Sequence, residues 1–385
     1  MAEKQTPMMI NGHGLGLEFF VVDEKTLSPL ALTGITSLGE GVTWSTAEGG
    51  TRVRISSSGA HRGISAAAAQ LAPVVVSLEA RLAGSGNGIL LPCGAHPFSG
   101  PAVNKDPVGD IEHQHSWTSS LCIELPFADE QEFGRLHTAI RMVLPLVPAI
   151  SASSPFMDGA RAEALSARVL MLLDGEGSDP ERLGAYIPEV ALDQADYFRI
   201  VLEPIARLLA DRGLGETVDY QAANQRAAVP SFERNVITIT VADTQECVAS
   251  AAAVAEMTTA VVMAMKDGRW VSSYLQRAWH ESDLRAILSD VVRDGGDANI
   301  LNRDFLLMFG LLRESTTAVE LWRHLYQQLR GDLSESARIH MGHILDHGNL
   351  AQRILRRTGE QPTRERMVKT YHELCTCLKE DKPLA

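Results

Sequence analysis

The chain has 385 residues, of which 45% are apolar, and a formal net charge of −13. A chain of this length and composition can bury one large core or two ordinary ones. The negative charge argues against a broad electrostatic grip on nucleic acid. The acidic residues are scattered along the chain, which indicates a solvated surface rather than an acidic tail.

The first residues, MAEKQTPMMINGHG, lack the apolar segment of a secretory signal. The most apolar helical stretch, 248–265, contains Glu256 and two threonines, so we expect a buried helix and no membrane span. The five cysteines form no CxxC pair, which argues against a disulfide framework or a zinc knuckle. These features predict a cytoplasmic protein with reduced thiols.

Strand-like runs separated by turns dominate the first third of the chain, and single strands cross its middle. We expect strands at 17–23, 27–34, 88–97, 120–127 and 235–243, and a hairpin over 41–57 that turns at EGG. Helical spacing predicts helices at 63–86, 129–150 and 197–213, and helices almost throughout the region after 243.

This order of elements predicts an α+β fold around a largely antiparallel sheet. There is no internal repeat, low-complexity tract or obvious linker, so we expect a single domain over 1–385. Its sheet-rich core spans about 1–247 and its helical C-terminal layer about 248–385. The apolar faces of the helices in that layer suit an internal core and a second copy of the chain equally well. The sequence therefore leaves open whether the protein forms a homo-oligomer.

The segment GHGLGLEFFVVD, residues 12–23, raises the question of a phosphate-binding loop. A dinucleotide fingerprint needs its glycines after a strand and before a helix, because the helix N-terminus holds the phosphates. Here Gly12, Gly14 and Gly16 precede a strand. The context therefore argues against a phosphate-binding loop.

Three histidines are candidates for chemistry. His113 and His115 are two residues apart, and on a strand both would face one side and could present two imidazoles to a metal. The alternative, a polar loop with surface histidines, is favoured because such pairs arise often. His96 lies where a strand meets a loop, a common place for functional side chains.

Three carboxylates lie on predicted strands. Glu18 opens one strand, Glu124 lies in another and Asp243 ends a third. Magnesium sites need oxygen ligands projected from rigid elements toward one cavity, and these three acids could supply them.

Several stretches, in order, resemble the type 2 glutamate–cysteine ligases, a family of carboxylate–amine ligases related in fold to glutamine synthetase. The most specific is LPFADEQEFGRLHTAIRMVLPLVPAISASSPFMDG, in which SSPFMDG resembles a family signature. The other stretches are GLEFFVVD, LPCGAHPF, VADTQEC, DGGDANILNRDFLLMFG, ILDHGNLAQRIL and VKTYHELCTCL. The resemblance spans nearly the whole chain.

The resemblance implies a glutamine synthetase-like antiparallel sheet that forms an active-site funnel backed by helices. In the family this funnel binds ATP and Mg²⁺. A substrate carboxylate, typically the γ-carboxylate of glutamate, attacks ATP to give an acyl phosphate, and an amine then displaces the phosphate. Such chemistry needs metal-binding acids, positive charge at the transferring phosphoryl group and a dry site.

The chain departs from the family where the charged residues should stand. The family's first strand carries Glu-x-Glu, and the corresponding residues here are Gly16 and Glu18. The late strand usually carries Glu-x-Arg, and those places correspond to Thr238 and Thr240. Threonine replaces neither charge, and loss of one such group often costs about two to three orders of magnitude in rate.

The central strand also differs from the family. It commonly carries a histidine beside the LPF element, and here Cys122 and Glu124 stand in that neighbourhood. Glu124 could compensate as a repositioned metal ligand.

Three functions follow from these observations. The first is a ligase with a rearranged site and a small amino-acid substrate, using ATP and Mg²⁺. In it Glu18 and Glu124 hold the metal, and the substrate-binding residues are His96, His115, Cys122, Asp243 and Gln245. The second is an inactive homologue that acts as a binding or regulatory subunit. The third is a pocket used for ATP-independent chemistry through His96, His115 and Cys122. All three require the strands of Glu18 and Asp243 to lie side by side.

Overall fold

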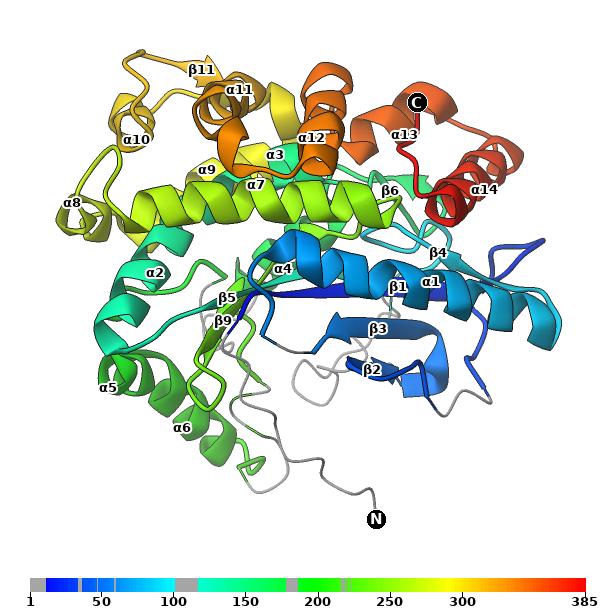
Figure 1. Ribbon diagram of the computed structural model, residues 1–385, viewed down its shortest axis with the longest axis horizontal. Coiled ribbons are helices and arrows are strands. Elements are labelled where there is room, and N and C mark those ends of the chain that lie inside the picture. The colour runs from blue at the N-terminus through cyan, green and yellow to red at the C-terminus, as the bar shows by residue number, and fades with distance from the viewer. Residues whose placement is uncertain are drawn as a thin grey trace.

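A computed structural model describes residues 12–33, 37–46, 48–58, 60–100, 117–177, 186–215, 219, 221 and 223–385. The predicted histidines 113 and 115 lie outside these residues, as does most of the polar loop that contains them. The fold is a mixed one, with a large sheet below and beside a layer of helices (Figure 1).

The large sheet has the strand order β2-β3-β1-β5-β9-β8, with β4 paired to β1. Every pairing in it is antiparallel, as the sequence predicted. Its strands are β1 (Gly14–Asp23), β2 (Val42–Thr46), β3 (Arg52–Ser57), β4 (Gly88–Leu91), β5 (Ser120–Pro126), β8 (Ala228–Ser231) and β9 (Val236–Asp243). Two small sheets pair β6 (Phe156–Met157) with β7 (Ala160–Arg161), and β10 (Asn299–Ile300) with β11 (Thr316–Thr317).

Helices supply the rest of the architecture and back the sheet, as expected. They are α1 (Ile64–Gly86), α2 (Glu130–Val143), α3 (Pro148–Ser151), α4 (Ala167–Gly177), α5 (Gln194–Tyr197), α6 (Glu203–Asp211), α7 (Val248–Lys266), α8 (Ser273–Arg277), α9 (Glu281–Asp294), α10 (Arg303–Met308), α11 (Ala318–Leu329), α12 (Glu335–His347), α13 (Leu350–Thr358) and α14 (Arg364–Glu380). Short 3₁₀ turns connect some of them: η1 (Glu48–Gly50), η3 (Leu144–Leu146), η5 (Gly295–Asp297) and η6 (Arg330–Asp332).

The alternation of side chains along β1 explains how the sheet is placed. Leu15, Leu17, Phe19 and Val21 point to one face and join the main core, which also contains residues of α1, α2, α7 and α12. Successive strand residues face opposite sides, so the residues between them point the other way. At the end of β1, Phe20 and Val22 pack on that second face with residues of α13 and α14. The stretch that holds Gly14, Gly16 and Glu18 carries the candidate site.

The long apolar helix α7 is a core helix, as the sequence predicted. Both α1 and α7 are long and apolar enough to cross a membrane by length and composition alone. Inside the fold, 78% of the apolar window of α7 is buried, compared with 44% for α1. Figure 1 shows α7 running across the molecule between the sheet and helices α11 and α12.

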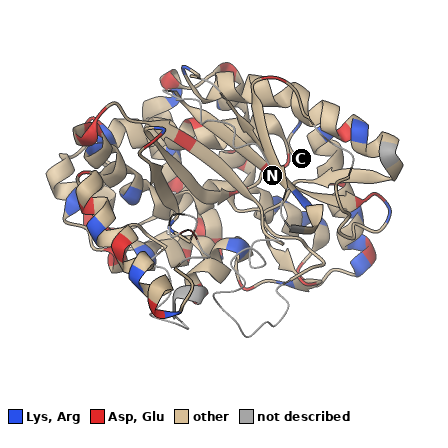
Figure 2. Cartoon of the chain, turned by 90° about the horizontal axis from the view of Figure 1, so that it is seen from below, with Lys and Arg blue, Asp and Glu red and all other residues tan. Residues whose placement is uncertain are grey.

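Acidic and basic residues are interspersed, in keeping with the scattered charges of the sequence. Figure 2 views the molecule from below and shows both signs of charge along the helices of the rim, with few charges on the central strands. The charges on those strands therefore stand out against an apolar sheet.

Two predicted strands were wrong or too long. Residues 27–33 form no strand; the segment has one isolated bridge, between Val22 and Pro29. The Asp23 carboxylate accepts bonds from the N–H groups of Lys25 and Thr26, which stabilises a turn there. The strand predicted over 88–97 ends at Leu91, because the next residue is a proline and has no N–H for the ladder.

The helix predicted over 129–150 is interrupted. It divides into α2, η3 and α3, and the breaks fall at Pro145 and Pro148, which cannot donate the helical hydrogen bond. The helix predicted over 197–213 contains a π-helical segment, η4 (Phe198–Leu202), between α5 and α6.

Gly134 in α2 permits a close approach that a side chain would block. A Cβ at this position would lie 2.3 Å from the carbonyl oxygen of Leu192. We therefore expect Gly134→Ala to lower the free energy of unfolding by about 1–3 kcal/mol through overpacking, although alanine favours helices. Chemical denaturation measures this change.

Gly342 in α12 is the matched control, because a Cβ there meets nothing within 4 Å. Gly342→Ala should raise the free energy of unfolding by up to about 1 kcal/mol. Equal stabilisation by both substitutions would contradict the packing of α2 against Leu192.

Candidate functional site

Glu18 is buried on the second face of β1, surrounded by donors from two neighbouring strands. It is 6% exposed. Its Oε2 accepts from the N–H of Ser120 at 2.7 Å and from the hydroxyl of Ser120 at 3.1 Å, both on β5. Two arginines of β3 complete the shell, with Arg52 Nη1 at 3.4 Å from Oε2 and Arg54 Nη1 at 3.9 Å from Oε1.

These donors keep Glu18 ionised. Burial acts to raise the pKa of the Glu18 carboxyl, but Arg52, Arg54 and the hydrogen bonds from Ser120 lower it further, so the pKa lies below its ordinary value. The carboxylate is thus satisfied by the protein itself.

Glu124 on β5 is held in a similar way. It is buried, and its Oε2 accepts from Nη2 of Arg234 at 2.5 Å. Its carboxylate lies over Gly14 of β1, because a Cβ at Gly14 would stand 2.6 Å from Glu124 Oε2. The glycine is required here by the close approach of that side chain.

The place of the missing family acid is filled by neighbours. A Cβ at Gly16 would lie 3.0 Å from Cys122 Cβ, 3.1 Å from Ser56 Oγ and 3.6 Å from Arg54 Nε. Cys122 is fully buried, and burial raises the pKa of its thiol. A side chain at position 16 would therefore require these neighbours to move by a few tenths of an ångström.

Asp243 and Gln245 form internal bonds at the end of β9. Asp243 accepts from the N–H of Ser153 at 2.9 Å and from the Arg168 guanidinium at 2.7 Å, and the hydroxyls of Ser154 and Ser166 also donate to it. A Cβ at Gly94 would lie only 2.4 Å from the Asp243 carboxyl carbon.

Gln245 donates to the carbonyl oxygens of Ser151 and Asp243, at 2.7 and 2.9 Å. The two residues bind β9 to the segment that carries the SSPFMDG signature. Their contact with substrate stays a prediction.

His96 is buried beside aromatic rings. It is 1% exposed, with its ring centroid 5.3 Å from that of Phe20 and 6.4 Å from that of Phe98. Its Nδ1 accepts from the N–H of Phe98, and burial lowers the pKa of the imidazole to about 4. The predicted partner His115 lies outside the described residues, so a joint substrate contact stays a prediction.

The strands of Glu18 and Asp243 belong to the same sheet, but the prediction that they lie side by side was wrong. They do not pair with each other, because β5 lies between β1 and β9. Ser120 of β5 pairs with Asp243, and the hydroxyl of Thr244 donates to the carbonyl oxygen of Glu18 at 2.9 Å. The acids therefore come from neighbouring elements.

Thr238 of β9 pairs with Glu124 of β5 across the same sheet. Residues 16, 238 and 240, the positions at which the resemblance implies charged residues, lie on β1 and β9, the two strands that flank β5.

The residues present do not fit a magnesium ion as they stand. Within the described part of the chain, no three His, Cys, Asp or Glu side chains come together in a way that could hold a metal. The two predicted ligands, Glu18 and Glu124, are each paired with arginine. Magnesium prefers several unencumbered oxygen ligands.

The arginines of the candidate site were not predicted from the sequence. Arg52 and Arg54 stand two residues apart in a predicted strand, a pattern that places both on one face. Arg234 lies in the turn between β8 and β9. The alternation of side chains along this strand could have indicated that Arg52 and Arg54 share a face. Their pairing with Glu18 depends on the register of β3 against β1, which the sequence does not show.

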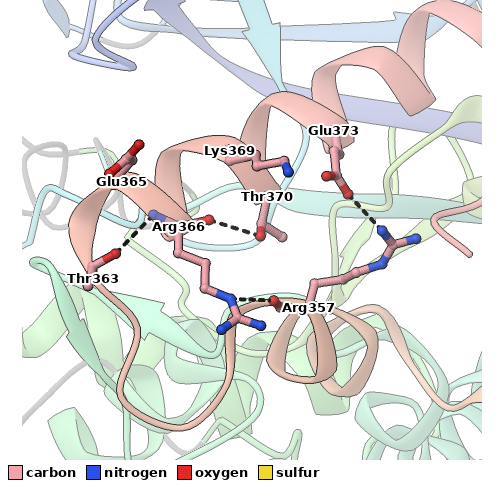
Figure 3. A pocket seen from close by; sticks show the side chains of 7 residues that line it. All are labelled: Arg357, Thr363, Glu365, Arg366, Lys369, Thr370 and Glu373. Carbon is pink, nitrogen blue, oxygen red and sulfur yellow. Dashed lines mark hydrogen bonds and ion pairs between the residues drawn. The ribbon is translucent and has the colours of Figure 1, made fainter.

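A second charged site lies between α13 and α14, where a cavity of about 440 Å³ is found (Figure 3). Arg357 pairs with Glu373 at 3.1 Å, and Nε of Arg366 donates to the carbonyl oxygen of Arg357 at 2.9 Å. Lys369 and Glu365 also line it. Both positive and negative side chains line this cavity, so its electrostatic potential does not have a single sign.

Comparison with known proteins gives the following matches. A family model described as glutamate–cysteine ligase family 2 matches residues 13–373. A relative from Archaeoglobus fulgidus, described only as an uncharacterized protein, is 29% identical over 153 residues, which are 39% of this chain and 41% of the relative. This chain thus spans less than half the length of that relative.

A solved structure of the complex between the prokaryotic ubiquitin-like protein Pup and its ligase PafA is similar over 95% of this chain and 66% of that chain. The TM-score is 0.39 and the identity is 14%.

The stabilising contribution of Glu18 should depend on pH in a defined direction. Because its pKa is depressed in the fold, the contribution is complete above the ordinary carboxyl pKa of about 4.3 and is lost as the pH falls through the folded-state value. Glu18→Gln should lower the free energy of unfolding by about 1–3 kcal/mol at neutral pH. Denaturation at a series of pH values should show this difference shrinking in acid.

Glu203→Gln is the control, because Glu203 forms an exposed helical pair with Arg207. It should change the free energy by less than about 0.5 kcal/mol. A gap between wild type and Glu18→Gln that stays constant down to strongly acidic pH would contradict the ionised state of Glu18.

Proposed function

Since the chain belongs to glutamate–cysteine ligase family 2, we propose that it is a carboxylate–amine ligase-like protein that binds a small carboxylate on its arginine-bearing sheet face without carrying out ATP-dependent ligation there. One observation carries this proposal: the two acids expected to hold Mg²⁺ are already paired with arginine side chains.

The phosphoryl chemistry of the family lacks its charged groups in this chain. Gly16, Thr238 and Thr240 stand where two acids and an arginine are expected. Metal ions and a guanidinium supply the stabilisation of phosphoryl transfer, and there is little else for the protein to contribute. Glu18 and Glu124 could serve as ligands only after breaking their arginine pairs.

The same face retains groups that suit an anion. The Arg54 and Arg234 side chains are 38% and 28% exposed, and with the described residues each makes one ion-pair contact, through one Nη atom. A guanidinium has five N–H donors in a planar fork that matches a carboxylate. These unused donors support the binding of an amino acid or another small carboxylate.

The runner-up is a working ligase in which Glu18 and Glu124 hold Mg²⁺ after rearrangement, with ATP as the second substrate. Membership of the family favours it. A ligand that binds only the folded state must raise the melting temperature, so one experiment separates the two proposals.

We expect Mg·ATP at millimolar concentration to change the melting temperature of the wild-type chain by less than about 1 °C, because the described residues contain no cluster of side chains that could hold the metal. Differential scanning fluorimetry with Mg·ATP, and with Mg²⁺ alone, measures this. A clear, saturable rise with Mg·ATP would favour the ligase instead.

A panel of amino acids and small dicarboxylates should contain members that raise the melting temperature by about 2–4 °C at saturation. Arg54→Gln should abolish that rise. Arg207→Gln, on the exposed surface of α6, is the control and should leave it unchanged. If no carboxylate stabilises the wild type, or if Arg54→Gln responds like the wild type, carboxylate binding at this face is wrong.

A further inference from the structure

Arg52 contacts oxygen atoms of two groups, and the hydroxyl of a third group is hydrogen-bonded to one of them. Its Nη1 donates to the carbonyl oxygen of Thr118 at 2.8 Å and lies 3.4 Å from Glu18 Oε2. The hydroxyl of Ser120 bonds the same carboxylate oxygen at 3.1 Å. A carboxylate, a backbone carbonyl and a hydroxyl are the kinds of ligand that hard divalent cations prefer.

Arg54 lies near the other oxygen of the same carboxylate, Oε1. It stands directly across from Glu18 in the pairing of β1 with β3, with its Nη1 3.9 Å from Oε1. The two guanidinium groups therefore bracket Glu18 from one strand. Together with Arg234 they bring three positive charges to a face that holds two buried acids, Glu18 and Glu124.

A buried carboxylate needs such a countercharge. Removing one partner of a buried ion pair leaves a charge without solvent or compensation, and this is strongly destabilising. A divalent cation can supply the countercharge, and so can guanidinium groups fixed to a neighbouring strand.

We propose that Arg52 and Arg54 replace a divalent cation as the permanent countercharge of Glu18, and that the oxygens of Glu18, Thr118 and Ser120 form a divalent-cation site once these arginines are removed. The inference rests on the proposed function, since it describes how the same face is stabilised without Mg²⁺. It adds that the guanidinium of Arg52 itself occupies the cation position.

The double variant Arg52→Ala/Arg54→Ala tests the proposal. Its melting temperature in chelator should fall by on the order of 5–10 °C, because Glu18 loses its countercharge. Millimolar MgCl₂ or MnCl₂, at an ionic strength matched with NaCl, should restore more than half of this loss. The wild-type chain should not respond to either salt.

Two controls separate a specific site from general screening. The triple variant that adds Glu18→Gln to the double variant should gain nothing from Mn²⁺, because the carboxylate ligand is gone. Arg207→Ala removes an exposed arginine that pairs with Glu203, and it should show neither the loss nor the rescue.

Mn²⁺ binding measured by electron paramagnetic resonance gives a second readout that does not depend on melting. The double variant should take up Mn²⁺ saturably and the wild type should not. If the double variant fails to fold, the single variant Arg52→Ala should bind Mn²⁺ in the same assay, since Arg52 is the residue in the cation position.

The proposal is wrong if the folded variants neither lose stability nor bind Mn²⁺, or if the wild type binds Mn²⁺ as tightly as the double variant. Failure of the proposed function has a different signature, namely stabilisation of the wild type by Mg·ATP. That result is read on the unmodified chain, so the two failures are distinguishable.

Discussion

The ion cluster around Glu18 connects the central strands of the sheet. Glu18 lies on β1, its hydrogen-bond donor Ser120 on β5, and its guanidinium partners on β3. The hydroxyl of Thr244, just after β9, reaches the backbone of the same residue. The buried charge thus requires β1, β3 and β5 to be in register, because any slip would leave it without donors.

A second buried charge links the end of β9 to the SSPFMDG segment. Asp243 is almost completely buried, binds Arg168 and the two serines of that segment, and packs against Gly94. These contacts hold parts of the chain that are far apart in sequence, so this part of the resemblance carries information about architecture, whereas function has to be argued from the site.

The sequence predicted the sheet and the long helices because their side chains follow a regular period. β1 ends in a continuous apolar run, β9 alternates apolar residues with threonine over its first half, and α7 is apolar along most of its length. The strand expected at 27–34 was wrong, because the Asp23 carboxylate stabilises a turn just before this segment. In the site, the acids were predicted and their partners were not, because Glu18 and Arg54 are brought together by a strand register that depends on the whole sheet.

Guanidinium and magnesium supply the same sign of charge to a carboxylate, but they support different chemistry. A magnesium ion accepts oxygen atoms of a phosphate directly and neutralises charge as it moves between groups. Arg52 is covalently fixed to β3 and offers only directed N–H donors, which bind an anion without entering its coordination sphere. In the proposed site, the arginines supply the countercharge of Glu18 but not the group that polarises ATP.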